Sequence, residues 1–193
     1  MEIVCSNCQK NFNTVQSFIC PFCGYLNALS RIDFFSYLGL EKNLDVNLAD
    51  LETKFLNLMS KYHPDNFVSK SSQEKINAQA HSVYLNNAYE TLKEPTLRFI
   101  YLYELANSEE IVKEIDSNNP ALFIEFLEYY EELENIKDNN SLKAFQTKLQ
   151  QMKNKVLQEN AVMDFTNKEL AYNIYLKLQY IDKIIASAKK AKI

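Results

Sequence analysis

The sequence contains few of the residues that make tight turns. Among 193 residues there are only two glycines and four prolines. Hairpin turns and phosphate-binding loops depend on glycine, which reaches backbone conformations that other residues avoid. Leucine, lysine, glutamate, asparagine and alanine are abundant, and 47% of the residues are hydrophobic, which is enough for a packed core. We therefore expect a mostly α-helical protein without a nucleotide-binding loop.

The chain also lacks an excess of positive charge and a long apolar run. Its formal net charge is −4, which opposes the phosphate neutralisation that nucleic-acid binding requires. No stretch of 18 apolar residues occurs, and the N-terminus has neither the apolar core of a secretory signal nor the pattern of a transit peptide. We expect a soluble protein that begins at its own Met1 and binds neither nucleic acid nor a membrane. We place it in the cytoplasm, with the mitochondrial matrix as the alternative.

Cysteine occurs only near the N-terminus, in two Cys-x-x-Cys pairs. Eleven residues separate the pairs, which consist of Cys5, Cys8, Cys20 and Cys23. Each pair can bring two thiolates to one ion, and two pairs complete a tetrahedral shell of four sulfurs. Gly24 follows the second pair, where the backbone must curl so that its amides face the sulfurs. A closed shell leaves no position for a catalytic water, so we predict a structural zinc site in a module over residues 1–28.

Other states of these cysteines stay open from the spacing alone. Two disulfides would suit a secreted protein, but the sequence has no export signal. A redox-active dithiol normally needs only one such pair. Iron binds the same four sulfurs as zinc, and the sequence does not exclude it. A segment this short needs a bound metal in order to fold.

A His63-Pro64-Asp65 tripeptide follows an amphipathic helix pattern over residues 48–62. Pro64 restricts the preceding residue to extended conformations, so the helix must end there. Lys54 and Lys61 lie one heptad apart and therefore share the solvent face of this helix, in line with the tripeptide. Taken alone, such lysines are also typical of an ordinary solvated face.

A second helix is expected to follow the tripeptide. Ser71 or Ser72 can cap it, Glu74 would be an acidic residue in its first turn, and it must end before Pro95. Two antiparallel helices of this kind form a hairpin whose loop is presented to solvent. A shorter helix from about Asp33 would pack across the hairpin.

Three further helix patterns follow Ser117-Asn118-Asn119-Pro120, where Asn or Ser can cap a helix and Pro120 suits its first position. The breaks between them are short, so neighbouring helices must be antiparallel. We predict a three-helix bundle over residues 117–193. The first of these helices carries Phe123, Ile124 and Leu127 beside its core-facing residues, which is more apolar surface than one face needs. This surplus either binds a partner or packs against the preceding helices.

These patterns resemble a known family. The sequence Lys61-Tyr62-His63-Pro64-Asp65, followed on the next helix by Leu85-Asn86-Asn87-Ala88-Tyr89-Glu90-Thr91-Leu92, resembles a J-domain. The segment Asp33-Phe34-Phe35-Ser36-Tyr37-Leu38-Gly39-Leu40, the continuation Pro95-Thr96-Leu97-Arg98 and the second helical domain make the chain most similar to the HscB family of iron–sulfur co-chaperones. The four-cysteine module resembles the extension in the zinc-bearing members. By this resemblance, residues 31–108 are a J-domain with a linking helix.

The resemblance implies a co-chaperone with no active site of its own. His63, Pro64 and Asp65, together with Lys54 and Lys61, would bind a heat-shock ATPase chaperone of the HscA or DnaK type and stimulate its ATP hydrolysis. The C-terminal bundle would bind an iron–sulfur scaffold protein of the IscU type through four residues, namely Phe123, Ile124, Leu127 and Glu128. We expect a monomer or a weak dimer.

One residue departs from the family pattern. J-domains usually have Lys or Arg directly after the tripeptide, whereas this chain has Asn66. The substitution removes one cation from the expected docking surface, so Lys54 and Lys61 must supply more of its charge.

Three other functions are weaker alternatives. A J-domain could serve another client, and a zinc ribbon could bind nucleic acid, which the acidic balance opposes. A catalytic His63–Asp65 pair would need a cysteine nucleophile, but every cysteine is better explained as a metal ligand. His81, the other imidazole in the sequence, is expected to be structural.

Overall fold

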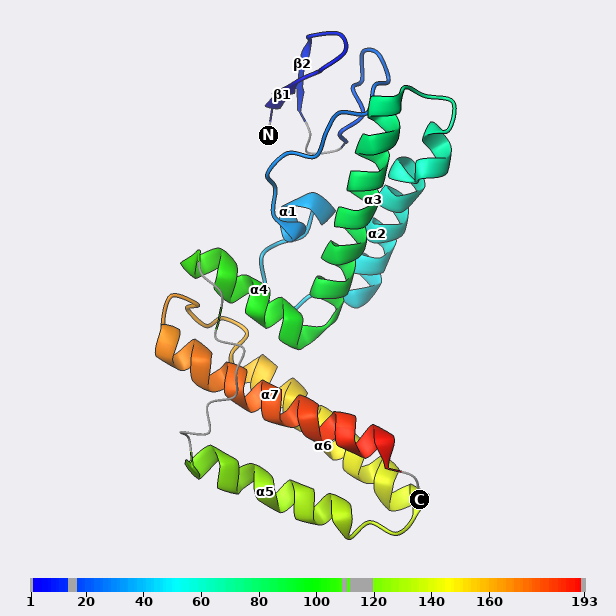
Figure 1. Ribbon diagram of the computed structural model, residues 1–193. Helices are drawn as coiled ribbons and strands as arrows, with labels where there is room; N and C mark the ends of the chain where they lie inside the picture. Colours follow the sequence, from blue (N-terminus) through cyan, green and yellow to red (C-terminus); the bar gives the residue numbers. More distant parts are fainter. Residues whose placement is uncertain (1, 14–16, 109–110, 112–119, 192–193) are drawn as a thin grey trace. The chain divides into compact units, whose positions relative to one another are not determined.

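The computed structural model describes residues 2–13, 17–108, 111 and 120–191, and this part of the chain is mostly α-helical as predicted (Figure 1). Contacts divide the chain into two compact units. The first unit comprises Met1–Lys42 and Val46–Glu94, and the second comprises Asn43–Asp45 and Pro95–Ile193. In chain order the elements are β1 (Glu2–Val4), β2 (Asn11–Asn13), α1 (Phe34–Leu38), α2 (Leu48–Tyr62), the 3₁₀ helix η1 (Pro64–Phe67), α3 (Ser72–Lys93), α4 (Pro95–Asn107), α5 (Pro120–Glu134), α6 (Asn139–Glu159) and α7 (Lys168–Lys190).

Helices α2 and α3 form the predicted hairpin of the first unit and lie side by side (Figure 1). Helix α2 buries Leu51 and Tyr62, and the ring of Phe55 stacks on Tyr89 of α3 at a centroid distance of 4.3 Å. Helix α3 begins with a capping box, in which the Ser71 hydroxyl accepts from the Glu74 amide and the Glu74 carboxylate accepts from the Ser71 amide. The expected cap is therefore confirmed.

Two three-residue strands open the first unit and were not predicted. Strands β1 and β2 pair antiparallel, with Ile3 opposite Phe12, and Ile19 forms an isolated bridge with Leu26. Strands this short show too little alternation to be recognised from sequence. The turn between β1 and β2 also avoids glycine, because Gln9 adopts the positive φ of 60° there.

Helix α7 forms the centre of the second unit and contacts α4, α5 and α6. The three C-terminal helices are the ones that the sequence predicts. Helix α4 joins them through its contacts with α7, and the ring of Phe99 packs against Phe165 at a centroid distance of 5.2 Å. The boundary between the two units, as defined by residue contacts, therefore lies between Glu94 and Pro95. The domain limits 1–28 and 31–108 stay predictions. The predicted start at 117 lies outside the described residues.

A buried polar cluster fastens three helices of this unit to one another. Lys153 of α6 is buried, and its Nζ lies 2.7 Å from Oδ1 of Asp182 on α7. The Thr96 hydroxyl of α4 donates to the other oxygen of Asp182 at 2.7 Å. Burial weakens solvent screening, so the electrostatic attraction between these two charges is stronger than that between the same charges at the surface. None of the described helices is long and apolar enough to span a membrane.

Alanine in place of Lys153 is expected to lower the free energy of unfolding by about 2 kcal/mol, because it leaves the Asp182 carboxylate without its buried cation. The matched control is Lys155→Ala on the same helix. Lys155 is largely exposed, and its Nζ lies 3.8 Å from the Glu159 carboxylate, so its loss should cost less than about 0.5 kcal/mol. Urea unfolding followed by circular dichroism measures both variants. Equal losses would show that the buried pair has no special role.

Candidate functional site

The four cysteine sulfurs of the first unit converge on one point. All four Sγ atoms lie within 4.8 Å of one another, with Cys5 and Cys23 3.6 Å apart and Cys8 and Cys20 3.7 Å apart. Four zinc–sulfur bonds of about 2.3 Å in a tetrahedron place the sulfurs about 3.8 Å apart, whereas a disulfide needs about 2 Å. The cysteines are free thiols arranged as a metal-binding set. The sulfur positions therefore favour a metal site over the disulfide alternative.

Each Cys-x-x-Cys pair lies in the same kind of turn. The Gln9 amide donates to the Cys5 carbonyl at 3.0 Å, and the Gly24 amide donates to the Cys20 carbonyl at 2.9 Å. Both donors have positive φ, at 60° and 73° respectively. In the first turn this curl directs the backbone amides of Asn7 and Cys8 at the Cys5 sulfur. The sequence identified Gly24 for this role but gave no signal for Gln9, which adopts the left-handed conformation despite its side chain.

The surroundings of Cys5 favour its thiolate. Burial is the largest single influence and raises the pKa of this thiol. Hydrogen bonds from the backbone amides of Cys8 and Asn7, together with those to the sulfurs of Cys23 and Cys20, outweigh it and lower the pKa to about 6. Buried Asn27 accepts from the Ser6 amide at 2.9 Å, and its own Nδ2 lies 3.9 Å from the Cys5 sulfur. Since metals bind the thiolate, these contacts prepare Cys5 as a ligand.

The His63-Pro64-Asp65 loop lies where α2 ends and η1 begins. Nδ1 of His63 accepts from the Asp65 amide at 3.3 Å and lies 3.5 Å from the Asp65 carboxylate. The two side chains are nevertheless 49% and 85% exposed. The loop is therefore held by its own contacts and presented to solvent.

An apolar patch lies on α5 in the second unit. Phe123, Ile124 and Leu127 are 51%, 61% and 42% exposed, and Glu128 beside them is also exposed. The opposite face of α5 is buried at Leu122 and Phe126. Whether this surplus apolar surface binds a partner or packs against the preceding helices stays a prediction.

Comparisons with known proteins match both units. The DnaJ domain model matches residues 33–101, and the HSCB C-terminal oligomerisation domain model matches residues 118–189. The chain belongs to the HscB-type J-domain co-chaperones. The crystal structure of human co-chaperone protein HscB is similar over 96% of each chain, with 27% identity and a TM-score of 0.83. The chaperone HscB from Vibrio cholerae is similar over 82% of this chain and 96% of its own, with 29% identity and a TM-score of 0.69.

The Jac1 co-chaperone from Saccharomyces cerevisiae shares the fold. Its 5–182 clone matches 84% of this chain and 97% of its own, with a TM-score of 0.64 at 18% identity. In an HscB-type protein, four clustered cysteines at the N-terminus are compatible with the zinc-bearing subtype. The sequence-based assignment of the family is therefore confirmed.

Asn66 has a structural role that the sequence did not reveal. Its side-chain amide donates to the Ser60 carbonyl at 2.7 Å, and its backbone amide donates to the His63 carbonyl at 3.0 Å. Carbonyls in the last turn of a helix have no partner within the helix, so the first bond satisfies one of them. The residue that replaces the usual J-domain cation thus fastens the loop of this HscB-type protein to the end of α2.

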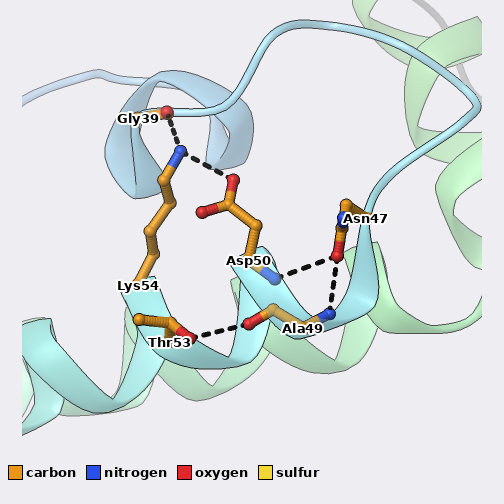
Figure 2. Close-up of polar contacts among 6 residues, drawn as sticks. All are labelled: Gly39, Asn47, Ala49, Asp50, Thr53 and Lys54. Carbon is orange, nitrogen blue, oxygen red and sulfur yellow. Dashed lines mark hydrogen bonds and ion pairs between the residues drawn. The ribbon is translucent and has the colours of Figure 1, made fainter.

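Lys54 is also less free than the helix pattern suggests. Its Nζ donates to the Gly39 carbonyl at 2.7 Å and lies 3.0 Å from the Asp50 carboxylate, as Figure 2 shows. Gly39 ends α1 in the left-handed conformation, so Lys54 ties α2 to the end of α1. Lys61 is exposed. The roles of Lys54, Lys61 and the tripeptide in chaperone binding stay predictions, and so does the role of the α5 patch in scaffold binding.

Serine in place of Cys20 is expected to reduce bound metal from one equivalent per chain to almost none. Cys20 is buried within the sulfur set, and a hydroxyl is a poor ligand for a metal held by thiolates. Phe22→Ala is the control, because Phe22 lies between the two cysteines of the same pair but is exposed. Metal released by a mercurial can be titrated with a chelating dye. Full occupancy in the Cys20→Ser variant would contradict a four-sulfur shell.

Proposed function

We propose that this protein is an adaptor in iron–sulfur cluster assembly and transfer. It binds a cluster scaffold protein of the IscU type, delivers it to a heat-shock ATPase chaperone of the HscA or DnaK type, and stimulates ATP hydrolysis by that chaperone. The observation that carries the proposal is the exposed His63-Pro64-Asp65 loop at the end of α2 in a chain of the HscB type.

The chaperone-binding end consists of the loop and the neighbouring face of α2. Asp65 offers a well-exposed carboxylate, and the loop already has an ordered backbone, so little conformational entropy is lost on binding. Lys61 adds an exposed cation one residue before Tyr62. Faster hydrolysis requires that the loop bind the hydrolysis-competent state of the chaperone better than its resting state. The bond chemistry belongs to the partner, and this protein needs no active site of its own.

The scaffold-binding end is the α5 patch. Its three large apolar side chains lose water when a complementary surface covers them, and this loss supplies the favourable free energy. Exposed Glu128 at the edge of the patch favours a partner that carries a cation there. A single chain that binds both partners raises the effective concentration of the scaffold at the chaperone, without any direct contact between the two at the outset.

Zinc is the metal that we propose for the four-cysteine centre. When bound, it supplies a tetrahedral cross-link between four thiolates and no open ligand position. Cys5, Cys8, Cys20 and Cys23 would hold it, and their spacing in the structure fits that shell. Metal analysis of protein purified without added metal distinguishes zinc from iron.

The test is a binding measurement combined with an ATPase assay. We expect an IscU-type scaffold to bind the full chain by calorimetry, and the chaperone's ATPase rate to rise further when scaffold and adaptor are added together than when either is added alone. Stimulation without scaffold binding would indicate a J-domain protein with another client. Scaffold binding without any stimulation would refute the chaperone-binding end of the proposal.

A further inference from the structure

A hydrogen bond joins the four-cysteine module directly to the end of α2. The backbone amide of Phe18 donates to the Tyr62 hydroxyl at 2.9 Å. Phe18 lies two residues before the metal-ligating Cys20, and Tyr62 lies one residue before His63. Both aromatic side chains are buried. One hydrogen bond, shielded from water, therefore joins the base of a cysteine turn to the residue that precedes the chaperone-binding loop.

The base of the same turn is held closed opposite Phe18. The Asn27 amide donates to the Phe18 carbonyl at 3.1 Å, and the Cys20–Cys23 turn lies between these two residues. Asn77 of α3 donates its side-chain amide to the carbonyl of buried Leu26 at 2.8 Å. The segments on the two sides of the turn are therefore each hydrogen-bonded to the helical hairpin. The position of the Phe18 amide thus depends on the shape of the turn.

A second connection reaches Tyr62 through His81, which is completely buried on α3. Its Nε2 lies 3.0 Å from the Asn27 carbonyl oxygen, and its Nδ1 lies 2.8 Å from the Tyr37 hydroxyl. Because a carbonyl oxygen can only accept, Nε2 carries the hydrogen and Nδ1 accepts from Tyr37. The neutral ring stacks on Tyr62 at a centroid distance of 4.8 Å. Asn27 also faces the Cys5 sulfur, so both cysteine pairs are linked to the same tyrosine.

We propose that the four-cysteine centre positions the His63-Pro64-Asp65 loop through Phe18 and Tyr62, so that the order of this loop depends on bound metal. Tyr62 is a positioning residue, and only the consequence for the chaperone rests on the proposed function. A module this short keeps its shape through the metal. When the metal leaves, the Phe18 amide loses its fixed place and the buried Tyr62 hydroxyl loses its donor. The last turn of α2, closed by the bond from the His63 amide to the Met59 carbonyl, then loosens.

Amide hydrogen exchange of the full chain tests the proposal without any partner protein. Exchange over residues 60–68 is measured by mass spectrometry with one equivalent of zinc and after chelation. In the unmodified protein we expect zinc to slow this exchange by about tenfold, the effect of one buried hydrogen bond. Tyr62→Phe keeps the ring and removes only the hydroxyl. It should retain one equivalent of zinc but exchange faster over residues 60–68 in the zinc-loaded state.

Tyr84→Phe is the matched control. It also removes one hydroxyl from a tyrosine of the first unit, but that hydroxyl donates to the Ile32 carbonyl and not to the module. This variant should keep the full effect of zinc on residues 60–68. Exchange over residues 85–92 of α3 reports whether chelation unfolds the whole unit. If it does, the test of the proposal is the exchange over residues 60–68 in the zinc-loaded Tyr62→Phe variant compared with the zinc-loaded Tyr84→Phe variant.

Two results would overturn the proposal. One is an exchange rate over residues 60–68 that does not change with zinc in the unmodified protein, and the other is a zinc-loaded Tyr62→Phe variant that exchanges like the unmodified protein. Neither result bears on chaperone stimulation, which the ATPase assay measures separately. Failure of the proposed function and failure of this positioning role are therefore distinguishable.

Discussion

A variant with alanine at His63, Pro64 and Asp65 is expected to lose all measurable stimulation of the chaperone ATPase and to keep its scaffold binding. The Asp65 side chain is 85% exposed, so its removal costs the fold little while it deletes a carboxylate that a partner can bind. Removal of Pro64 also allows α2 to continue past Tyr62, because alanine favours helix where proline ends it. The loop would then lose both its charge and its shape.

Single-turnover ATPase rates of the chaperone, measured with increasing adaptor, provide the readout for this variant. Asp65→Asn separates the two effects, because it removes the charge and leaves Pro64 to end the helix. Val68→Ala is the control, since Val68 is exposed close after the loop but outside the tripeptide. Stimulation by the triple-alanine variant at the level of the unmodified protein would refute the loop as the chaperone-binding element.

Alanine at both Phe123 and Leu127 is expected to weaken scaffold binding by about 100-fold, since truncation of two apolar contacts at the centre of an interface costs on the order of 3 kcal/mol. The helix itself should persist. Leu122 and Phe126 hold the other face of α5, and the Phe126 ring stacks on Tyr180 of α7 at a centroid distance of 5.1 Å. Isothermal titration calorimetry measures the affinity, and circular dichroism measures the helix content.

Leu170→Ala is the matched control for this pair. Leu170 is 42% exposed, the same fraction as Leu127, but it lies on α7 outside the patch. Its substitution should leave the affinity for the scaffold unchanged. If the double variant loses its helix content, the two residues are part of the core. If it binds as tightly as the unmodified protein, the scaffold binds elsewhere.

The helices of this protein were predictable because their signals are local. Ser71 with Glu74 three residues later marks the start of α3, and Pro64 marks the end of α2; both marks depend on bonds between near neighbours in the chain. The four cysteines were equally readable, since their spacing alone brings the sulfurs together. The same locality explains why the periodic C-terminal helices could be placed from sequence.

Contacts between distant residues could not be predicted in this way. Nothing in the spacing of Lys54 indicates that its ammonium reaches the Gly39 carbonyl fifteen positions earlier. The bond from Asn66 to Ser60 depends on the path of the loop, which η1 sets. The docking of the cysteine module through Phe18 onto Tyr62 spans 44 positions. Tertiary packing decides all three, and single-sequence patterns carry no information about it.

The polar contacts between the cysteine module and the hairpin also determine whether the module can be moved as a separate part. Asn77, His81 and Tyr62 all direct polar atoms at backbone groups of residues 18–27. A chain that lacks residues 1–28 would leave these three side chains facing water beside an uncovered aromatic surface, with a tendency to self-associate. A graft of residues 1–28 onto another J-domain would need the same three acceptor and donor positions. In this protein the module can therefore be transferred only together with the residues of α2 and α3 that hold it.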